Sequence, residues 1–76
     1  MALTEEITIQ LNGATTHVRV GCTVAELVAA TLPNARAFAV EVNRAVLSRR
    51  EHASHEVRDG DSVEIVTLVG AVEPYL

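Results

Sequence analysis

The sequence predicts an α+β domain in which one helix packs across one face of a mixed sheet of four or five strands. Three observations lead to this prediction. Apolar and polar residues alternate in two runs on either side of an Asn-Gly pair, a capped segment of helical period follows, and alternation returns in the second half of the chain. A chain of 76 residues has room for a single core.

The first two runs predict a β-hairpin. Asn12-Gly13 lies between them, and this pair suits a type I′ turn because both central residues of that turn need a positive φ. Two antiparallel strands are therefore expected over residues 7–20. The positions that alternate with polar residues are Ile7, Ile9, Leu11, Thr16, Val18 and Val20.

The segment after the hairpin predicts a helix of two to three turns. Thr23 is a suitable N-cap, and Glu26 lies three residues further on, so the two predict a capping box. Pro33 ends the helix near Leu32, because the residue before a proline disfavours helical dihedrals. The apolar residues at helical spacing are Val24, Leu27, Val28 and Leu32.

Strands are expected again after the helix. In "AFAVEVN" the side chains of Phe38, Val40 and Val42 share one face, and "RAVLSR" is suited to a short partner strand. "REHASHEV" has no clear period, which predicts a loop or a single turn. "RDGD" predicts a tight turn before the last strand.

The last strand, "SVEIVTLV", is apolar on both faces. Val63, Ile65 and Val69 are expected to point into the core, which leaves Val66 and Leu68 on the face that a single helix does not cover. Two interpretations are open for these two residues. Either the loop in the fifties covers them, or they form a patch on which a partner docks.

Composition excludes several functions. Six Arg against ten acidic residues give a formal charge of −4, which is unfavourable for nucleic-acid binding. There is no Lys for a Schiff base, no apolar run of membrane-spanning length, and an acidic N-terminus where a signal peptide would be basic. We expect a cytoplasmic protein that is monomeric when free, and the preference for Ala, Val and Arg indicates a GC-rich bacterial genome.

Residues able to carry chemistry are few. The sequence has no nucleophile–base pair, no phosphate-binding Gly loop and no paired catalytic carboxylates, so we expect neither an enzyme nor an intrinsic cofactor or metal. Cys22 cannot form an internal disulfide. It lies just before a helix N-terminus, where a thiolate is favoured, but a packed side chain at a strand–helix corner is the preferred interpretation.

The histidines and the basic cluster are expected at the surface. His17, His52 and His55 include one pair with a spacing of three, but no third ligand follows, so solvated side chains are preferred over a metal site. The "RRE" stretch that begins at Arg49 is expected to be solvated or salt-bridged. Alternatively, Arg49 orients the edge of the sheet toward a partner.

The order of elements resembles the β-grasp fold shared with ubiquitin, and within that fold the chain resembles the ThiS-type sulfur carrier proteins of thiamine biosynthesis. The matching stretches are "ITIQLNG", the helix opening "TVAEL", "FAVEVN", and Arg49 followed by "RDGDSVEIVTLVG". The resemblance covers residues 7–70, and we assign 1–70 to the domain and 71–76 to a C-terminal tail. The small subunit of molybdopterin synthase shares the scheme, but "VEIVTLVG" is closer to the thiamine branch.

The resemblance implies a carrier without catalysis of its own. An activating enzyme uses ATP to adenylate the C-terminal carboxylate, a sulfur-transfer step makes a thiocarboxylate, and thiazole synthase receives the sulfur. The carrier tail then corresponds to Gly70 and Ala71. The docking surface corresponds to Val66, Leu68 and Arg49.

The tail departs from the family, which ends in Gly-Gly. Here Gly70 is followed by Ala71 and by five further residues. Three interpretations are open: a protease trims the tail after residue 70 or 71, the chain has lost the carrier chemistry and is a β-grasp interaction or regulatory module, or the end of the sequence is altered. The β-grasp modules appended to GTPases and tRNA synthetases have a similar closing motif, so they are the alternative class.

Overall fold

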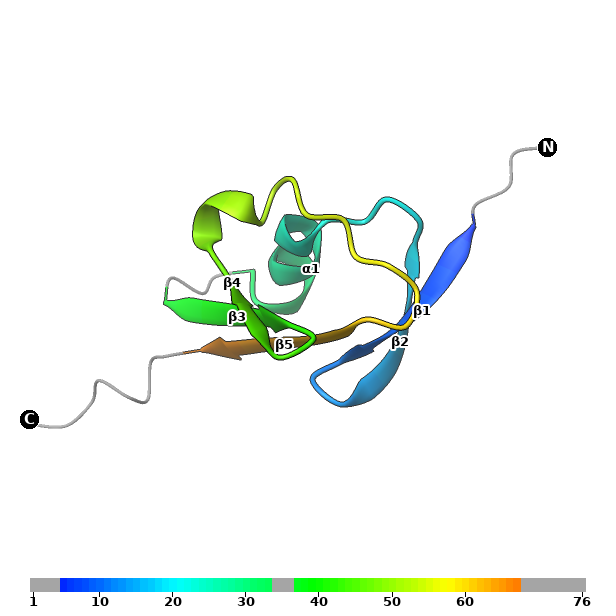
Figure 1. Ribbon diagram of the computed structural model, residues 1–76, viewed down its shortest axis with the longest axis horizontal. Coiled ribbons are helices and arrows are strands. Elements are labelled where there is room, and N and C mark those ends of the chain that lie inside the picture. The colour runs from blue at the N-terminus through cyan, green and yellow to red at the C-terminus, as the bar shows by residue number, and fades with distance from the viewer. Residues whose placement is uncertain (1–4, 34–36, 68–76) are drawn as a thin grey trace, which may run out of the picture.

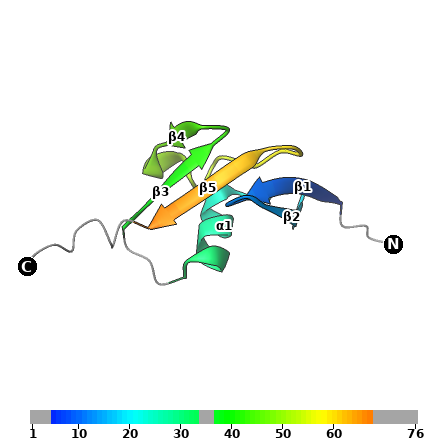
Figure 2. The same cartoon turned by 90° about the horizontal axis from the view of Figure 1, so that it is seen from below.

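A computed structural model of the protein describes residues 5–33 and 37–67. The elements are β1 (Glu6–Leu11), β2 (Ala14–Arg19), α1 (Val24–Thr31), β3 (Phe38–Val42), β4 (Ala45–Leu47), the 3-10 helix η1 (Arg49–Glu51) and β5 (Ser62–Thr67). The strands form one sheet in the order β2-β1-β5-β3-β4, in which β1 runs parallel to β5 and the other pairs are antiparallel. Helix α1 lies across one face of this sheet (Figures 1 and 2). The α+β prediction is confirmed.

The hairpin forms as predicted, except at its end. Asn12 and Gly13 have φ angles of 52° and 84°, as a type I′ turn requires. Strand β2 stops at Arg19, and Val20 is 55% exposed, so the expected alternation does not extend to Val20. The chain turns away from the sheet directly after it, at Gly21, whose φ is 92°.

The turn residue Asn12 also ties the hairpin to the central strand. Its side-chain Oδ1 accepts a hydrogen bond from the backbone N–H of Ile65 at 2.8 Å, and its Nδ2 donates to the carbonyl of the same residue at 3.3 Å. This amide therefore pairs with β5 as a neighbouring strand would. The sequence pattern predicted only a turn-forming role for Asn12.

Helix α1 has the predicted caps. The Thr23 hydroxyl accepts from the Glu26 backbone N–H at 3.2 Å, and the Glu26 carboxylate accepts from the Thr23 N–H at 3.0 Å, which completes the capping box. The helix ends at Thr31, with Leu32 as C-cap just before Pro33. No helix in the described part of the chain is long and apolar enough to cross a membrane.

The segment after η1 packs around the N-terminal end of α1. The N–H groups of Val24 and Ala25 donate to the carbonyls of His55 and His52, both at 2.9 Å, so they satisfy two helix donors that lack partners within the helix. Val57, which is 3% exposed, then enters the core. The 3-10 helix and the loop after it confirm the expected irregular segment, which lies on the helix side of the sheet (Figure 1).

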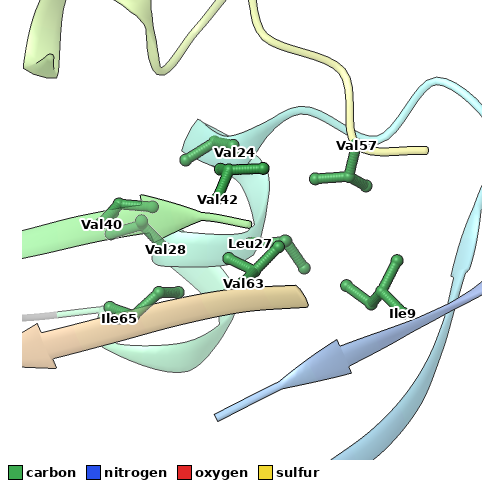
Figure 3. Packing of buried hydrophobic residues seen from close by; sticks show 9 residues of the cluster. All are labelled: Ile9, Val24, Leu27, Val28, Val40, Val42, Val57, Val63 and Ile65. Carbon is green, nitrogen blue, oxygen red and sulfur yellow. The ribbon is translucent and has the colours of Figure 1, made fainter. Parts of the chain in front are cut away.

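The core lies between α1 and the inner faces of β1, β3 and β5. Figure 3 shows helix side chains directed at the strands, with Val57 closing one end. The alternation that predicted the inner positions of β3 and β5 is confirmed for the residues that the structure describes, while Val69 lies outside them. The buried apolar residues are Ile9, Val24, Leu27, Val28, Val40, Val42, Val57, Val63 and Ile65.

Candidate functional site

The candidate site is the end of the sheet at which β5 finishes. Strand β5 is the central strand, held between β1 and β3, and Thr67 at its end pairs with Phe38 at the start of β3. Strand β1 pairs with β5 only at Ser62 and Val63, so the end of β5 is held by its pairing with β3. The predicted tail residues Gly70 and Ala71, and the predicted docking residue Leu68, lie outside the described residues.

An aromatic and basic cluster lies beside this exit, on the helix side of the sheet. The guanidinium carbon of Arg49 is 4.3 Å from the centroid of the Phe38 ring, which is a cation–π distance. The rings of Phe38 and His52 lie with their centroids 5.8 Å apart. The predicted residue Arg49 therefore lies near the end of β5 through its contact with Phe38. From the sequence, Phe38 was expected only to share one strand face with Val40 and Val42.

His52 is buried, so the expectation of a solvated side chain is wrong for this residue. It is 7% exposed, and its Nε2 lies 3.3 Å from the carbonyl oxygen of Leu47. The reason is η1, which turns the chain after β4 so that residue 52 faces inward. His17 is exposed on β2, and His55 is half-buried beside α1.

The face of the sheet opposite α1 carries exposed apolar side chains. Val66 of β5 is 50% exposed and Val46 of β4 is 73% exposed, and Ala39 lies opposite Val66 in the register. The loop in the fifties lies on the other side of the sheet, so the interpretation that it covers Val66 is wrong (Figure 2). We call this uncovered surface the outer face.

The two described docking candidates lie on different sides of the sheet. Val66 points to the outer face, whereas Arg49 contacts Phe38, whose neighbours in alternation, Val40 and Val42, point into the core. Both are close to Thr67 in the fold, so they flank the exit of the chain instead of forming one continuous surface.

Cys22 packs against the core, as preferred from sequence. Its Sγ lies 3.6 Å from the Thr23 carbonyl oxygen. Burial, followed by the nearby carboxylate of Glu26, raises the pKa of the Cys22 thiol. A raised pKa disfavours the thiolate, so the structure does not support a reactive cysteine.

No metal centre is present in the described stretches. Within residues 5–33 and 37–67, no group of three or more His, Cys, Asp or Glu side chains is placed to hold a metal ion. An open depression lies at the end of the sheet where β5 begins, away from the tail. Its lining residues are Val42, Asn43, Ser54, His55, Glu56, Arg58 and Asp61.

The fold and the exit of its central strand define the class of protein. A five-stranded mixed sheet with one helix across it, one open face and a chain that leaves from the middle strand is a ubiquitin-like β-grasp domain. A family model described as the ThiS family matches residues 5–70. The chain belongs to the ThiS family, whose members are small sulfur carriers of thiamine biosynthesis.

Comparison with solved structures agrees with this assignment. Three solved chains match, and one of them is a thiamine biosynthesis protein (ThiS) from Geobacter metallireducens. That protein is 32% identical, with a TM-score of 0.68, and the match covers 80% of this chain and 93% of the other. No curated protein matches the chain.

Proposed function

We propose that this protein carries sulfur as a thiocarboxylate at its C-terminus for the formation of a thiazole ring. The observation that supports it most is the ThiS family match, which extends to residue 70, just beyond the central strand β5. A carrier needs a rigid body and a terminus that another protein can reach. The central strand β5, which precedes this segment and pairs with β3 as far as Thr67, supplies the rigid body.

The reaction takes place on the terminal carboxylate. A carboxylate oxygen attacks the α-phosphorus of ATP in the activating enzyme and releases pyrophosphate, which gives an acyl-adenylate. Sulfide or its equivalent then attacks the acyl carbon, AMP leaves, and the thiocarboxylate forms. The carrier supplies only the carboxylate and the docking surface, because catalysis belongs to the activating enzyme.

The sequence of the tail determines which carboxylate reacts. Glycine at both terminal positions allows any φ and has no Cβ to contact a narrow channel. Gly70 meets this condition, whereas Ala71 adds one methyl group and five residues follow it. We propose that the reacting terminus is produced by cleavage after Gly70 or Ala71.

Intact mass after reaction tests this function. Four chains are incubated with the activating enzyme of the same organism, ATP and sulfide: the full chain, chains ending at Gly70 and at Ala71, and an A71G chain that ends at residue 71. We expect one of the two natural truncated ends to gain the mass of one oxygen-to-sulfur replacement. The Gly-Gly chain is the control for an active enzyme.

The alternative function is a β-grasp interaction module that has lost the carrier chemistry, and the presence of Ala71 in place of a second glycine favours it. In this case only the Gly-Gly control reacts, while the natural chains bind the activating enzyme without a change in mass. That result would overturn the carrier function and leave docking intact.

A further inference from the structure

The outer face divides into two halves that differ in how their polar groups are satisfied. In the β1–β2 half, polar side chains opposite one another bond across the hairpin. Thr8 Oγ1 lies 3.1 Å from His17 Nδ1, and Gln10 Nε2 donates to Thr15 Oγ1 at 3.2 Å. This half is a self-contained polar surface.

In the other half, formed by β5, β3 and β4, two carboxylates face each other. Glu41 of β3 and Glu64 of β5 are direct partners in the antiparallel register, and Val46 of β4 lies opposite Glu41 on its other side. Neither glutamate side chain has a hydrogen-bond or ion-pair partner among the described residues. Like charges directly opposite each other destabilise a sheet, so this arrangement is unfavourable in the free protein.

The outer-face side chains of β3, β4 and β5 around the glutamate pair are mostly apolar, and none of them supplies a positive charge. Alternation places six described side chains of β3, β4 and β5 on the outer face, and none of them is basic. Two of them are the exposed valines Val46 and Val66. Exposed apolar side chains that lie together on one face indicate a surface on which another protein binds. The six residues are Ala39, Glu41, Val46, Ser62, Glu64 and Val66.

We propose that this half of the outer face docks a protein that places an arginine between Glu41 and Glu64 and apolar side chains against Val46 and Val66. Carboxylates on directly opposed strand positions are close together. The guanidinium group of arginine is planar and has five N–H donors that point in different directions, so one guanidinium can donate hydrogen bonds to both carboxylates. The bound arginine replaces the repulsion between the two glutamates by attraction to each.

The identity of the partner follows from the position of the surface, and here the inference rests on the proposed function. Val66 is the residue before Thr67, where β5 ends, so a protein seated on this half lies beside the exit of the tail. The activating enzyme is the protein that must hold the domain while it acts on the tail. We therefore assign the arginine to the activating enzyme.

Two other occupants are disfavoured by charge. The tail of this chain, residues 68–76, contains Glu73 and no basic residue, so it supplies no cation. A second copy that docks through the same face in a twofold arrangement would bring two glutamate pairs together, which adds to the repulsion. A partner with the complementary charge fits the surface best.

The test removes the two charges without changing side-chain shape. The variant E41Q/E64Q is compared with E51Q/E56Q, which loses the same charge from exposed residues outside the sheet's outer face. Affinity for the activating enzyme is measured by titration without ATP, and thiocarboxylate formation is measured on the reactive truncated chain. Thermal unfolding of each variant is recorded as well.

We expect E41Q/E64Q to bind roughly tenfold more weakly and to raise KM with little change in kcat. Its melting temperature should rise, because the repulsion is gone, so weaker binding cannot be attributed to unfolding. Added NaCl should weaken the wild type and affect this variant little. The control variant should bind like the wild type.

Binding of E41Q/E64Q with wild-type affinity, or an equal loss in the control variant, would overturn the docking proposal. The proposed function is judged separately. It fails if the wild-type chains gain no sulfur while the Gly-Gly control does, and the affinity measurement still decides the role of the glutamate pair.

Discussion

Arg49 lies over Phe38, with its guanidinium carbon 4.3 Å from the ring centroid, at the point where β3 begins and β5 ends. The buried imidazole of His52 also lies beside this ring. η1 thus attaches to the end of the sheet through one aromatic side chain. The cluster of Phe38, Arg49 and His52 places the guanidinium of Arg49 near the end of β5. The interaction energy between Phe38 and Arg49 can be measured.

A double-mutant cycle between Phe38 and Arg49 should give a coupling energy of about 0.5–1 kcal/mol, as expected for an exposed cation–π pair. The variants are F38L, R49Q and both together, with stability measured by urea unfolding. A parallel cycle with R50Q is the control, because Arg50 is exposed and follows Arg49 in the same turn. Equal coupling in the two cycles would show that the contact contributes nothing.

The bond between Asn12 and Ile65 should matter more than the turn that Asn12 forms. N12G keeps a residue that accepts a positive φ but leaves the Ile65 N–H without its acceptor, so we expect a loss of about 1–2 kcal/mol. N12D keeps the acceptor for the Ile65 N–H but sets a carboxylate oxygen against the Ile65 carbonyl, so it should also be less stable than the wild type. Chemical denaturation measures both, and an N12G variant as stable as the wild type would contradict the role of the side chain.

The elements that sequence predicted well depend on neighbours in the chain. The capping box of Thr23 and Glu26 spans three residues, and the turn at Asn12-Gly13 needs only the φ preferences of those two. The outward direction of Val66 also follows from alternation alone. These signals are complete within a short window, and the structure has each of them where it was expected.

The features that sequence missed depend on which distant segments meet. The Asn12 amide meets a residue 53 positions away, and Glu41 faces Glu64 only because β3 and β5 pair in one particular register. His52 was predicted to be exposed because histidine is polar. It is buried because η1 turns its side chain inward. In the candidate site, alternation correctly predicted that Val66 points away from the core. It did not predict which side of the sheet the loop in the fifties covers.

The β3–β4 turn contains a residue whose replacement should stabilise the protein. Asn43 and Arg44 have φ angles of 52° and 73°, and a left-handed conformation is unfavourable for arginine but not for glycine. R44G should raise the free energy of unfolding by about 0.5 kcal/mol, after the larger entropy of glycine in the unfolded chain is included. The measurement is the urea midpoint at constant m-value.

A matched change at the partner position serves as the control for that turn. N43G also accepts the positive φ, but it removes the side-chain bonds to the Ser62 N–H at 2.9 Å and to Asp61 Oδ1 at 3.0 Å. It should therefore destabilise the protein while R44G stabilises it. If both variants shift the midpoint in the same direction, backbone strain at Arg44 is not the deciding factor.

The thiol of Cys22 should react slowly with alkylating reagents. Its pKa is raised, first by burial and then by the Glu26 carboxylate, so less thiolate is present at neutral pH than in a free cysteine. The rate of iodoacetamide labelling, followed by mass, should rise with pH through a midpoint above that of a small free thiol. The same protein unfolded in urea should react like the free thiol.

The variant E26Q separates the two causes of this shift. It removes the negative charge beside the sulfur and keeps an oxygen that can accept from the Thr23 N–H, so α1 retains its cap. The midpoint should fall, but it should stay above the value of the free thiol, because burial is the larger cause and is unchanged. A wild-type midpoint at or below that of the free thiol would mean that the helix N-terminus stabilises the thiolate after all, and Cys22 would have to be considered as a reactive group.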